Sequence, residues 1–88
     1  MKKFFQDKSI LITGGTGSFG IRCTEKLFTS FKPKKVVIFS RDELKQYELS
    51  KKFPEKDYPI RYLIGDIRDR KLIFKSLKNI DLVIHLAY

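Results

Sequence analysis

The chain has 88 residues, of which 42% are hydrophobic and 14% aromatic, so it can build the core of one small domain and is not a disordered tail. Its net charge of +9 is shared almost evenly by its two halves (+5 and +4), so no basic tail or arm indicates nucleic-acid binding. One Cys and one His provide neither a disulfide nor a metal site, and no apolar run approaches the roughly 20 residues of a membrane span. A reducing, cytoplasmic setting fits this composition.

Four short apolar runs, at residues 9–13, 35–39, 60–64 and 81–86, predict β-strands. The first, second and fourth are continuous and rich in Ile and Val rather than alternating. Such runs are typical of strands that are buried on both faces of a parallel sheet.

Helical patterns separate the strands. From Gly20, the residues Cys23, Leu27 and Phe31 recur on one apolar face, and Pro33 ends this first helix. The spacing predicts that this face packs on the sheet.

The second and third helices have candidate N-caps. Ser40 and Glu43 match the capping box S-x-x-E, which predicts a helix from Ser40 to about Lys52. Asp66 can cap the third helix. The buried face of that helix is predicted to comprise Leu72, Ile73 and Leu77.

The segment T-G-G-T-G-S-F-G at 13–20 contains G-x-G-x-x-G as Gly15, Gly17 and Gly20. It follows a strand and opens a helix, which is the context that dinucleotide binding requires. The glycines allow a turn with positive φ, a close approach of the backbone to a pyrophosphate, and tight packing of helix on strand. The helix N-terminus then presents N–H groups to the phosphates. The alternative is a glycine-rich turn that binds nothing.

Together these elements predict an α/β fold: a partial NAD(P)-binding Rossmann fold with a parallel sheet in the strand order 3-2-1-4 and flanking helices. A chain of 88 residues is too short to wall a two-lobed active-site cavity. We therefore expect residues 1–88 to be the N-terminal portion of one Rossmann domain, without its catalytic and substrate-binding portion.

The end of the second strand indicates the cofactor. About 20 residues after the glycine motif, where an acidic residue would hold the ribose of NAD, the chain has Ser40 and Arg41. A hydroxyl beside a guanidinium suits the 2′-phosphate of NADP, and Lys45 adds a second cation. Asp42 and Glu43 oppose this interpretation, and a capping role alone would also explain Ser40. On balance the residues favour NADP over NAD.

Three further residues lie near the expected ligand. Asp66 either reads the adenine edge or caps its helix, and the two roles can coexist. His85 is expected to be a core or backbone-positioned residue rather than a catalytic one. Ala87 is small, as the cofactor-facing end of a strand should be.

The segments 13–20, 40–46 (S-R-D-E-L-K-Q) and 64–69 (I-G-D-I-R-D) resemble the N-terminal part of extended short-chain dehydrogenases/reductases. More closely, they resemble the UDP-N-acetylglucosamine 4,6-dehydratases of bacterial polysaccharide and flagellin-sugar biosynthesis. The resemblance extends over essentially the whole chain. It departs at 85–88, where the family usually reads H-A-A-A and this chain reads H-L-A-Y.

The resemblance implies a lyase with a tightly held NADP, which takes hydride from carbon 4 of the sugar and returns it at carbon 6 after water is lost across carbons 5 and 6. In the family the Asp-Lys pair, the Tyr-x-x-x-Lys motif and the sugar-binding lobe lie further along the chain. The UDP-sugar is therefore expected to bind only the full-length parent, and the 88-residue chain alone is expected to be inactive.

Carried over by position, the resemblance implies a set of cofactor-binding residues. Thr16, Gly17, Ser18 and Phe19 line the pyrophosphate, with Gly14 and Gly20 at the ends of the loop. Ser40, Arg41, Asp42 and Lys45 surround the 2′-phosphate end, Asp66 and Ile67 meet the adenine, and Ala87 meets the ribose on the nicotinamide side.

Other interpretations remain open. The chain could derive from another extended reductase or a sugar epimerase, or it could be a non-catalytic NADP-binding module or the remnant of a truncated gene. Tyr47 and Lys51 form a literal Tyr-x-x-x-Lys, but in the helix after the second strand, far from any nicotinamide, so no catalytic residue is predicted. We expect no nucleic-acid, membrane or metal partner, and possible self-association at the edge of the fourth strand.

Overall fold

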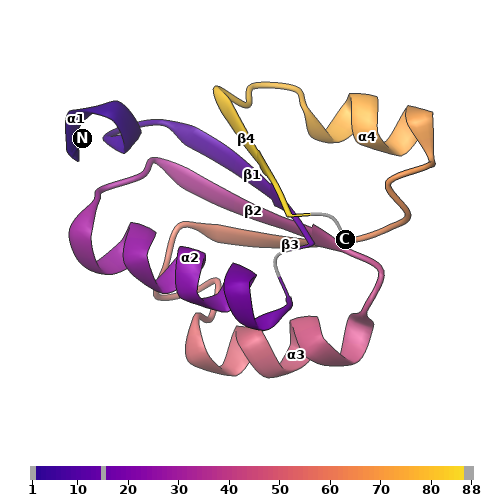
Figure 1. The fold of residues 1–88 in the computed structure, drawn as a ribbon, viewed down its shortest axis with the longest axis horizontal. Coiled ribbons are helices and arrows are strands. Elements are labelled where there is room, and N and C mark those ends of the chain that lie inside the picture. Colours follow the sequence, from indigo (N-terminus) through magenta and orange to yellow (C-terminus); the bar gives the residue numbers. More distant parts are fainter. Residues whose placement is uncertain (1, 15, 87–88) are drawn as a thin grey trace.

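The computed structural model describes residues 2–14 and 16–86, in which four parallel strands form one sheet in the order β3-β2-β1-β4 (Figure 1). The strands are β1 (Ser9–Thr13), β2 (Lys35–Ser40), β3 (Ile60–Ile64) and β4 (Leu82–His85). In the centre of the sheet, Ile12 pairs with Ile38 on one side and with Ile84 on the other. The predicted α/β class and strand order are confirmed.

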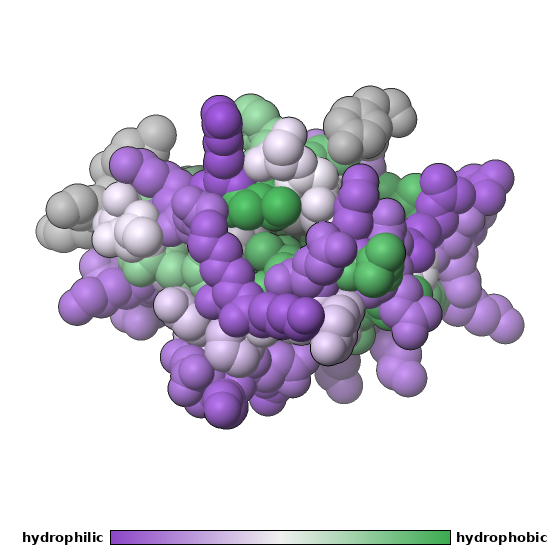
Figure 2. All heavy atoms as spheres, turned by 90° about the horizontal axis from the view of Figure 1, so that it is seen from below, coloured by the Kyte–Doolittle hydropathy of each residue, from purple (hydrophilic) through white to green (hydrophobic). Residues whose placement is uncertain are grey.

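Helices lie on both faces of the sheet. They are α1 (Lys2–Phe5), α2 (Ser18–Ser30), α3 (Glu43–Lys52) and α4 (Arg70–Ser76). In Figure 1, α2 and α3 lie below the sheet and α4 lies above it. Seen from below, the surface over α2 and α3 is largely hydrophilic, with smaller hydrophobic areas between the charged side chains (Figure 2). In the described part of the chain, no helix has the length and apolar character that crossing a bilayer requires.

The two central strands are buried on both faces, which explains why their sequences are continuous apolar runs. Ile10, Ile12, Val36 and Ile38 point toward α2 and α3, where they join one core cluster. The alternate residues of the same strands belong to a second cluster on the side of α4, since successive side chains of a strand point to opposite faces. The buried members of this second cluster are Leu11, Val37 and Phe39.

The prediction that β4 is buried on both faces is wrong. Its side chains alternate between partly buried and exposed, and Val83 is 51% exposed. Within the described residues, β4 pairs on one side only, with β1, and so lies at the edge of the sheet. A continuous apolar run therefore overestimates burial where a strand forms the edge of the sheet.

The helix boundaries differ from the predictions at their N-termini. The first long helix begins at Ser18, two residues before the expected Gly20, and α3 begins at Glu43 rather than at Ser40. Ser40 is the last residue of β2, and Asp42 caps α3 by accepting a hydrogen bond from the Lys45 N–H. The Ser40 capping box is therefore wrong.

The third predicted cap is also wrong. Asp69, rather than Asp66, accepts a hydrogen bond from the Leu72 N–H at 3.1 Å and caps α4. Leu72 and Ile73 pack against the core as expected. Leu77 is the C-cap residue and is 39% exposed, so it does not belong to the buried face.

Candidate functional site

The glycine loop begins with a backbone conformation that only glycine adopts readily. Gly14 has a φ of +69°, and its N–H donates to the Phe39 carbonyl at 3.0 Å. A Cβ atom at this position would lie 2.0 Å from the carbonyl oxygen of Leu86. The first glycine is therefore required by the chain's own backbone, at the point where the end of β4 approaches the loop. Gly15 lies outside the described residues.

The N-terminus of α2 is arranged to donate hydrogen bonds. Gly17 is the N-cap and has no side chain that could cap the helix. The Ile21 N–H donates to the Gly17 carbonyl at 2.9 Å, so the N–H groups of residues 18–20 precede the first intrahelical bond and have no acceptor within the helix. The first turn also lacks an acidic residue. Its partial positive charge is thus not offset by the helix's own side chains.

The predicted loop residues occupy different environments. Thr16 and Gly20 are buried, whereas Ser18 and Phe19 are exposed, Phe19 to 69%. Exposure of Ser18 and Phe19 leaves the start of α2 open to solvent on the side where a phosphate would approach.

A hollow of about 660 Å³ connects the glycine loop with the end of β2. Arg41 and Lys45 provide two cations at its wall, and Ser40 provides a hydroxyl. The complete lining is Gly14, Thr16, Gly17, Ser40, Arg41, Asp42, Glu43 and Lys45. Eight residues from two separate segments thus meet at one place, and seven of them belong to the predicted cofactor-binding set.

A smaller hollow of about 190 Å³ adjoins the first and shares Gly14, Ser40 and Arg41 with it. Its remaining lining residues are Thr13, Phe39, Gly65, Ile67, His85 and Leu86. Gly65 is small for a packing reason, because a Cβ there would lie 2.3 Å from the Leu72 side chain. This second hollow has the apolar walls that suit a flat base.

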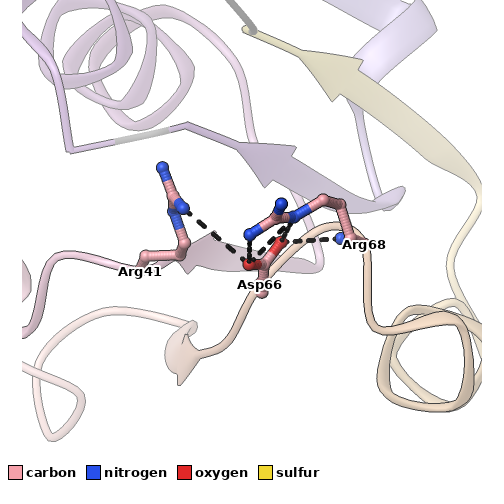
Figure 3. Close-up of polar contacts among 3 residues, drawn as sticks. All are labelled: Arg41, Asp66 and Arg68. Atoms are coloured by element: carbon pink, nitrogen blue, oxygen red, sulfur yellow. Dashed lines mark hydrogen bonds and ion pairs between the residues drawn. The ribbon is translucent and has the colours of Figure 1, made fainter.

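Asp66 lies between two arginines at the end of β3 (Figure 3). Its carboxylate accepts hydrogen bonds from the Arg68 guanidinium at 2.8 and 3.2 Å and from the Arg68 backbone N–H at 2.8 Å. Arg41 is the more distant partner, at 3.8 Å. The hydrogen bonds from Arg68, with the positive charges of both arginines, lower the pKa of Asp66 to about 2.

This arrangement bears on the two roles considered for Asp66. The helix-capping role is wrong, as described above. The carboxylate is hydrogen-bonded to Arg68. The Ile67 side chain, by contrast, is 47% exposed and lines the smaller hollow. Contact with an adenine edge therefore stays a prediction, one that Ile67 suits better than the Asp66 carboxylate.

His85 and Tyr47 are predicted from the sequence to be non-catalytic. The His85 side chain is exposed, so it is not a core residue, and its Nδ1 lies 2.5 Å from the Thr13 hydroxyl on the neighbouring strand. Tyr47 is 59% exposed on α3, with the Lys51 ammonium 4.7 Å from its ring centroid. Neither Tyr47 nor Lys51 lines either hollow at the glycine loop.

Two residues near the site were not singled out individually from the sequence. Gln46 was noted only as part of the S-R-D-E-L-K-Q run, and in the structure it is 3% exposed and joins α3 to the ends of β2 and β3. Arg68 follows Asp66 by two residues, a spacing at which Asp commonly accepts from the backbone. The sequence carries no signal for the burial of Gln46 beyond its place in that run. The predicted Ala87 lies outside the described residues.

A larger hollow, of about 760 Å³, lies at the opposite end of the sheet and includes Lys34, Lys35, Arg61 and Asp81 in its lining. It is formed at the amino ends of the strands. Ligands of open parallel α/β sheets bind at the carboxyl ends, where the glycine loop lies. Location and loop chemistry therefore outweigh size, and the candidate site is the pair of hollows around Gly14, Ser40 and Arg41.

The chain has a Rossmann-type fold with a dinucleotide-type loop. The first strand of its parallel sheet leads through the glycine loop into a helix without a side-chain cap, and hollows lie at the carboxyl ends of β1, β2 and β3. The sequence profile of the family described as "Polysaccharide biosynthesis protein" matches residues 10–88, and the chain belongs to this family.

Among its relatives, the chain is 49% identical over 83 residues to the UDP-N-acetylglucosamine 4,6-dehydratase (inverting) of Campylobacter jejuni strain 81-176, covering 94% of this chain and 24% of the relative. It is 40% identical over 86 residues to a UDP-glucose 4-epimerase of Rickettsia bellii, with 94% and 25% covered. The chain thus spans about a quarter of the length of these relatives.

Solved structures agree with this assignment. The structure of Pen from Bacillus thuringiensis superposes with a TM-score of 0.86 at 46% identity, over 96% of this chain and 25% of that one. A dTDP-glucose 4,6-dehydratase from Bacillus anthracis in complex with NAD superposes with a TM-score of 0.76 at 20% identity, over 91% and 26%. The second comparison supports the fold alone.

Proposed function

We propose that residues 1–88 are the N-terminal, cofactor-binding portion of an NADP-dependent nucleotide-sugar dehydratase that converts UDP-N-acetylglucosamine to a 4-keto-6-deoxy sugar. The observation that carries the proposal is the hollow between the glycine loop and the end of β2, in a chain that is 49% identical to such a dehydratase. In this proposal the activity would belong to a longer protein, since the chain spans 24% of the length of that relative.

The residues present fit a dinucleotide. The N–H groups at the start of α2 suit the pyrophosphate, and the smaller, more apolar hollow beside Gly65 and Ile67 suits the adenine. When bound, the nicotinamide would accept and return the hydride of the dehydration. In this proposal the chain's own residues hold and orient that group, and the acid and base residues lie elsewhere in the longer protein.

Preference for NADP over NAD is supported by the charges near Ser40. Arg41 and Lys45 line the hollow, and Arg41 can make paired hydrogen bonds to a phosphate. The acidic Asp42 opposes a preference for NADP only weakly. Its Oδ1 already accepts a hydrogen bond from the Lys45 N–H at 3.0 Å, as the N-cap of α3. A carboxylate used in this way is less available to the two ribose hydroxyls of NAD.

A chimera tests the proposed function. The 83-residue matching segment of the Campylobacter dehydratase would be replaced by the corresponding residues of this chain. We expect the purified chimera to retain NADP and to form the 4-keto-6-deoxy product from UDP-N-acetylglucosamine. The same chimera carrying Arg41→Ala should retain less NADP. A folded chimera without bound nicotinamide cofactor would contradict the proposal.

The product distinguishes the alternative activity. Since a 4-epimerase is among the relatives, a chimera that interconverts 4-epimers of the UDP-sugar without loss of water would favour the epimerase interpretation. The isolated 88-residue chain should form neither product, because the catalytic motifs of the resembled family are not among its residues.

A further inference from the structure

Gln46 is a buried polar residue beside the candidate site, and its side-chain NH₂ donates to neighbouring groups. Its Nε2 donates to the Leu63 carbonyl at 2.7 Å and to the Ser40 Oγ at 3.0 Å, with a longer contact of 3.5 Å to the Ser40 carbonyl. The residue is 3% exposed. These bonds join α3 to the ends of β2 and β3.

The Leu63 carbonyl fixes which way the amide points. A carbonyl can only accept, so the group that faces it must be the NH₂ and not the oxygen of Gln46. The same NH₂ faces Ser40 Oγ, and an amide nitrogen cannot accept a hydrogen bond from a hydroxyl. Ser40 Oγ is therefore an acceptor toward Gln46, and its own proton must point elsewhere.

The hollows are one direction open to that proton. Ser40 lines both of them, and Arg41 and Lys45 lie in the wall of the larger one. A hydroxyl donor next to two cations is a combination that an anion satisfies. Without Gln46, the hydroxyl could instead rotate to donate to a nearby carbonyl.

We propose that Gln46 is a positioning residue that directs the Ser40 hydroxyl proton toward the 2′-phosphate of NADP, and so contributes to the selection of NADP over NAD without touching the cofactor. This inference rests on the proposed function of the site. It assigns part of the cofactor preference to a buried residue of α3, beyond the exposed cations.

The test compares two small probes that differ only in the 2′-phosphate. The full chain and its variants would be titrated by calorimetry with adenosine 2′,5′-bisphosphate and with adenosine 5′-monophosphate, and the ratio of the two dissociation constants measures recognition of the 2′-phosphate. Gln46→Met removes the donor at similar size. Gln46→Glu replaces it with an acceptor, which draws the Ser40 proton away from the site.

We expect Gln46→Glu to reduce the preference by about tenfold or more, and Gln46→Met to reduce it less, since a hydrogen bond to a charged group is lost or misdirected. The control is Gln6→Glu, which adds the same negative charge at the chain's other glutamine. Gln6 is exposed in the turn before β1. It should leave the ratio within about twofold, the range expected of a distant surface charge.

A double-mutant cycle separates positioning from general damage. Loss of fold would weaken both probes equally and leave their ratio unchanged. In a Ser40→Ala background, the uncharged Gln46→Met substitution should change the ratio no further, because the hydroxyl through which Gln46 acts is gone. Full additivity of the two effects would overturn the inference.

The remaining outcomes are distinguishable. If the wild-type chain prefers the 2′-phosphorylated probe and a Gln46→Glu variant with the circular-dichroism spectrum of the wild type keeps that preference, the role of Gln46 is wrong while the NADP proposal stands. If the wild-type chain binds both probes equally, the NADP proposal itself fails, and the inference fails with it.

Discussion

Substitution of Gly14 by Ala tests whether the glycine loop is shaped by the chain's own backbone. The φ of +69° is costly for any residue with a Cβ, by about 1–2 kcal/mol. The new methyl would also lie 2.0 Å from the Leu86 carbonyl oxygen, far inside van der Waals contact, so the end of β4 must move. That movement endangers the 3.0 Å hydrogen bond from the Leu86 N–H to the Thr13 carbonyl, worth about 0.5–1.5 kcal/mol.

We therefore expect Gly14→Ala to lower the free energy of unfolding by about 2–4 kcal/mol, which corresponds to roughly 8–32 °C in Tm for a domain of this size. Urea and thermal unfolding followed by circular dichroism measure the change. Gly17→Ser is the matched control in the same loop, because its φ of −74° suits any residue. A loss below about 1 kcal/mol for Gly14→Ala would refute the reasoning, since strain at this φ alone should exceed it.

Three other substitutions extend the account. Gly17→Ser supplies a side-chain cap to α2, so it should raise the free energy of unfolding in urea by up to about 1 kcal/mol. It should also weaken the binding of NADP and of NAD equally in calorimetry, because the Ser hydroxyl would accept from N–H groups that the proposed function assigns to the pyrophosphate. Asp66→Asn should lower the free energy of unfolding above pH 3.8, because the folded state favours the ionised carboxylate. The difference in this free energy from wild type should shrink as the pH falls toward about 2. Urea unfolding across that range, with the exposed Asp57→Asn as control, measures it, and a pH-independent difference would count against the Arg68 contact. Tyr47→Phe should leave the cofactor affinity of the chain and the turnover of the chimera unchanged within about twofold, because Tyr47 is exposed on α3 and lines neither hollow.

The layout of the fold could be predicted because its signals are local and repeated. Continuous runs such as 9–13 and 35–39 reflect burial on both faces, and the alternation with helical segments leaves few topologies open. Prediction failed where several residues compete for one role. Ser40, Asp42, Asp66 and Asp69 are all suitable N-caps, and only the paths of the strands decide that Asp42 and Asp69 cap while the other two bind side chains.

The candidate site shows the same division. The glycine loop and the end of β2 could be brought together from the sequence, because parallel strands present their carboxyl ends at one edge. The bonds of Gln46 to Ser40 and Leu63, and of Asp66 to Arg68, could not, since they depend on side-chain directions that only packing sets. The burial of β4 was overestimated because hydropathy does not report whether a strand has one neighbour or two.

The most direct test of the central claim, NADP recognition at Ser40 and Arg41, is calorimetric titration of the chain with NADP and with NAD, for wild type and for Arg41→Ala. Arg70→Ala, an exposed arginine of α4 outside both hollows, is the matched control. We expect wild type and Arg70→Ala to bind NADP more tightly than NAD, and Arg41→Ala to lose this preference while its affinity for NAD is unchanged. Equal binding of both cofactors by a folded wild-type chain, or a preference that survives Arg41→Ala, would contradict this claim.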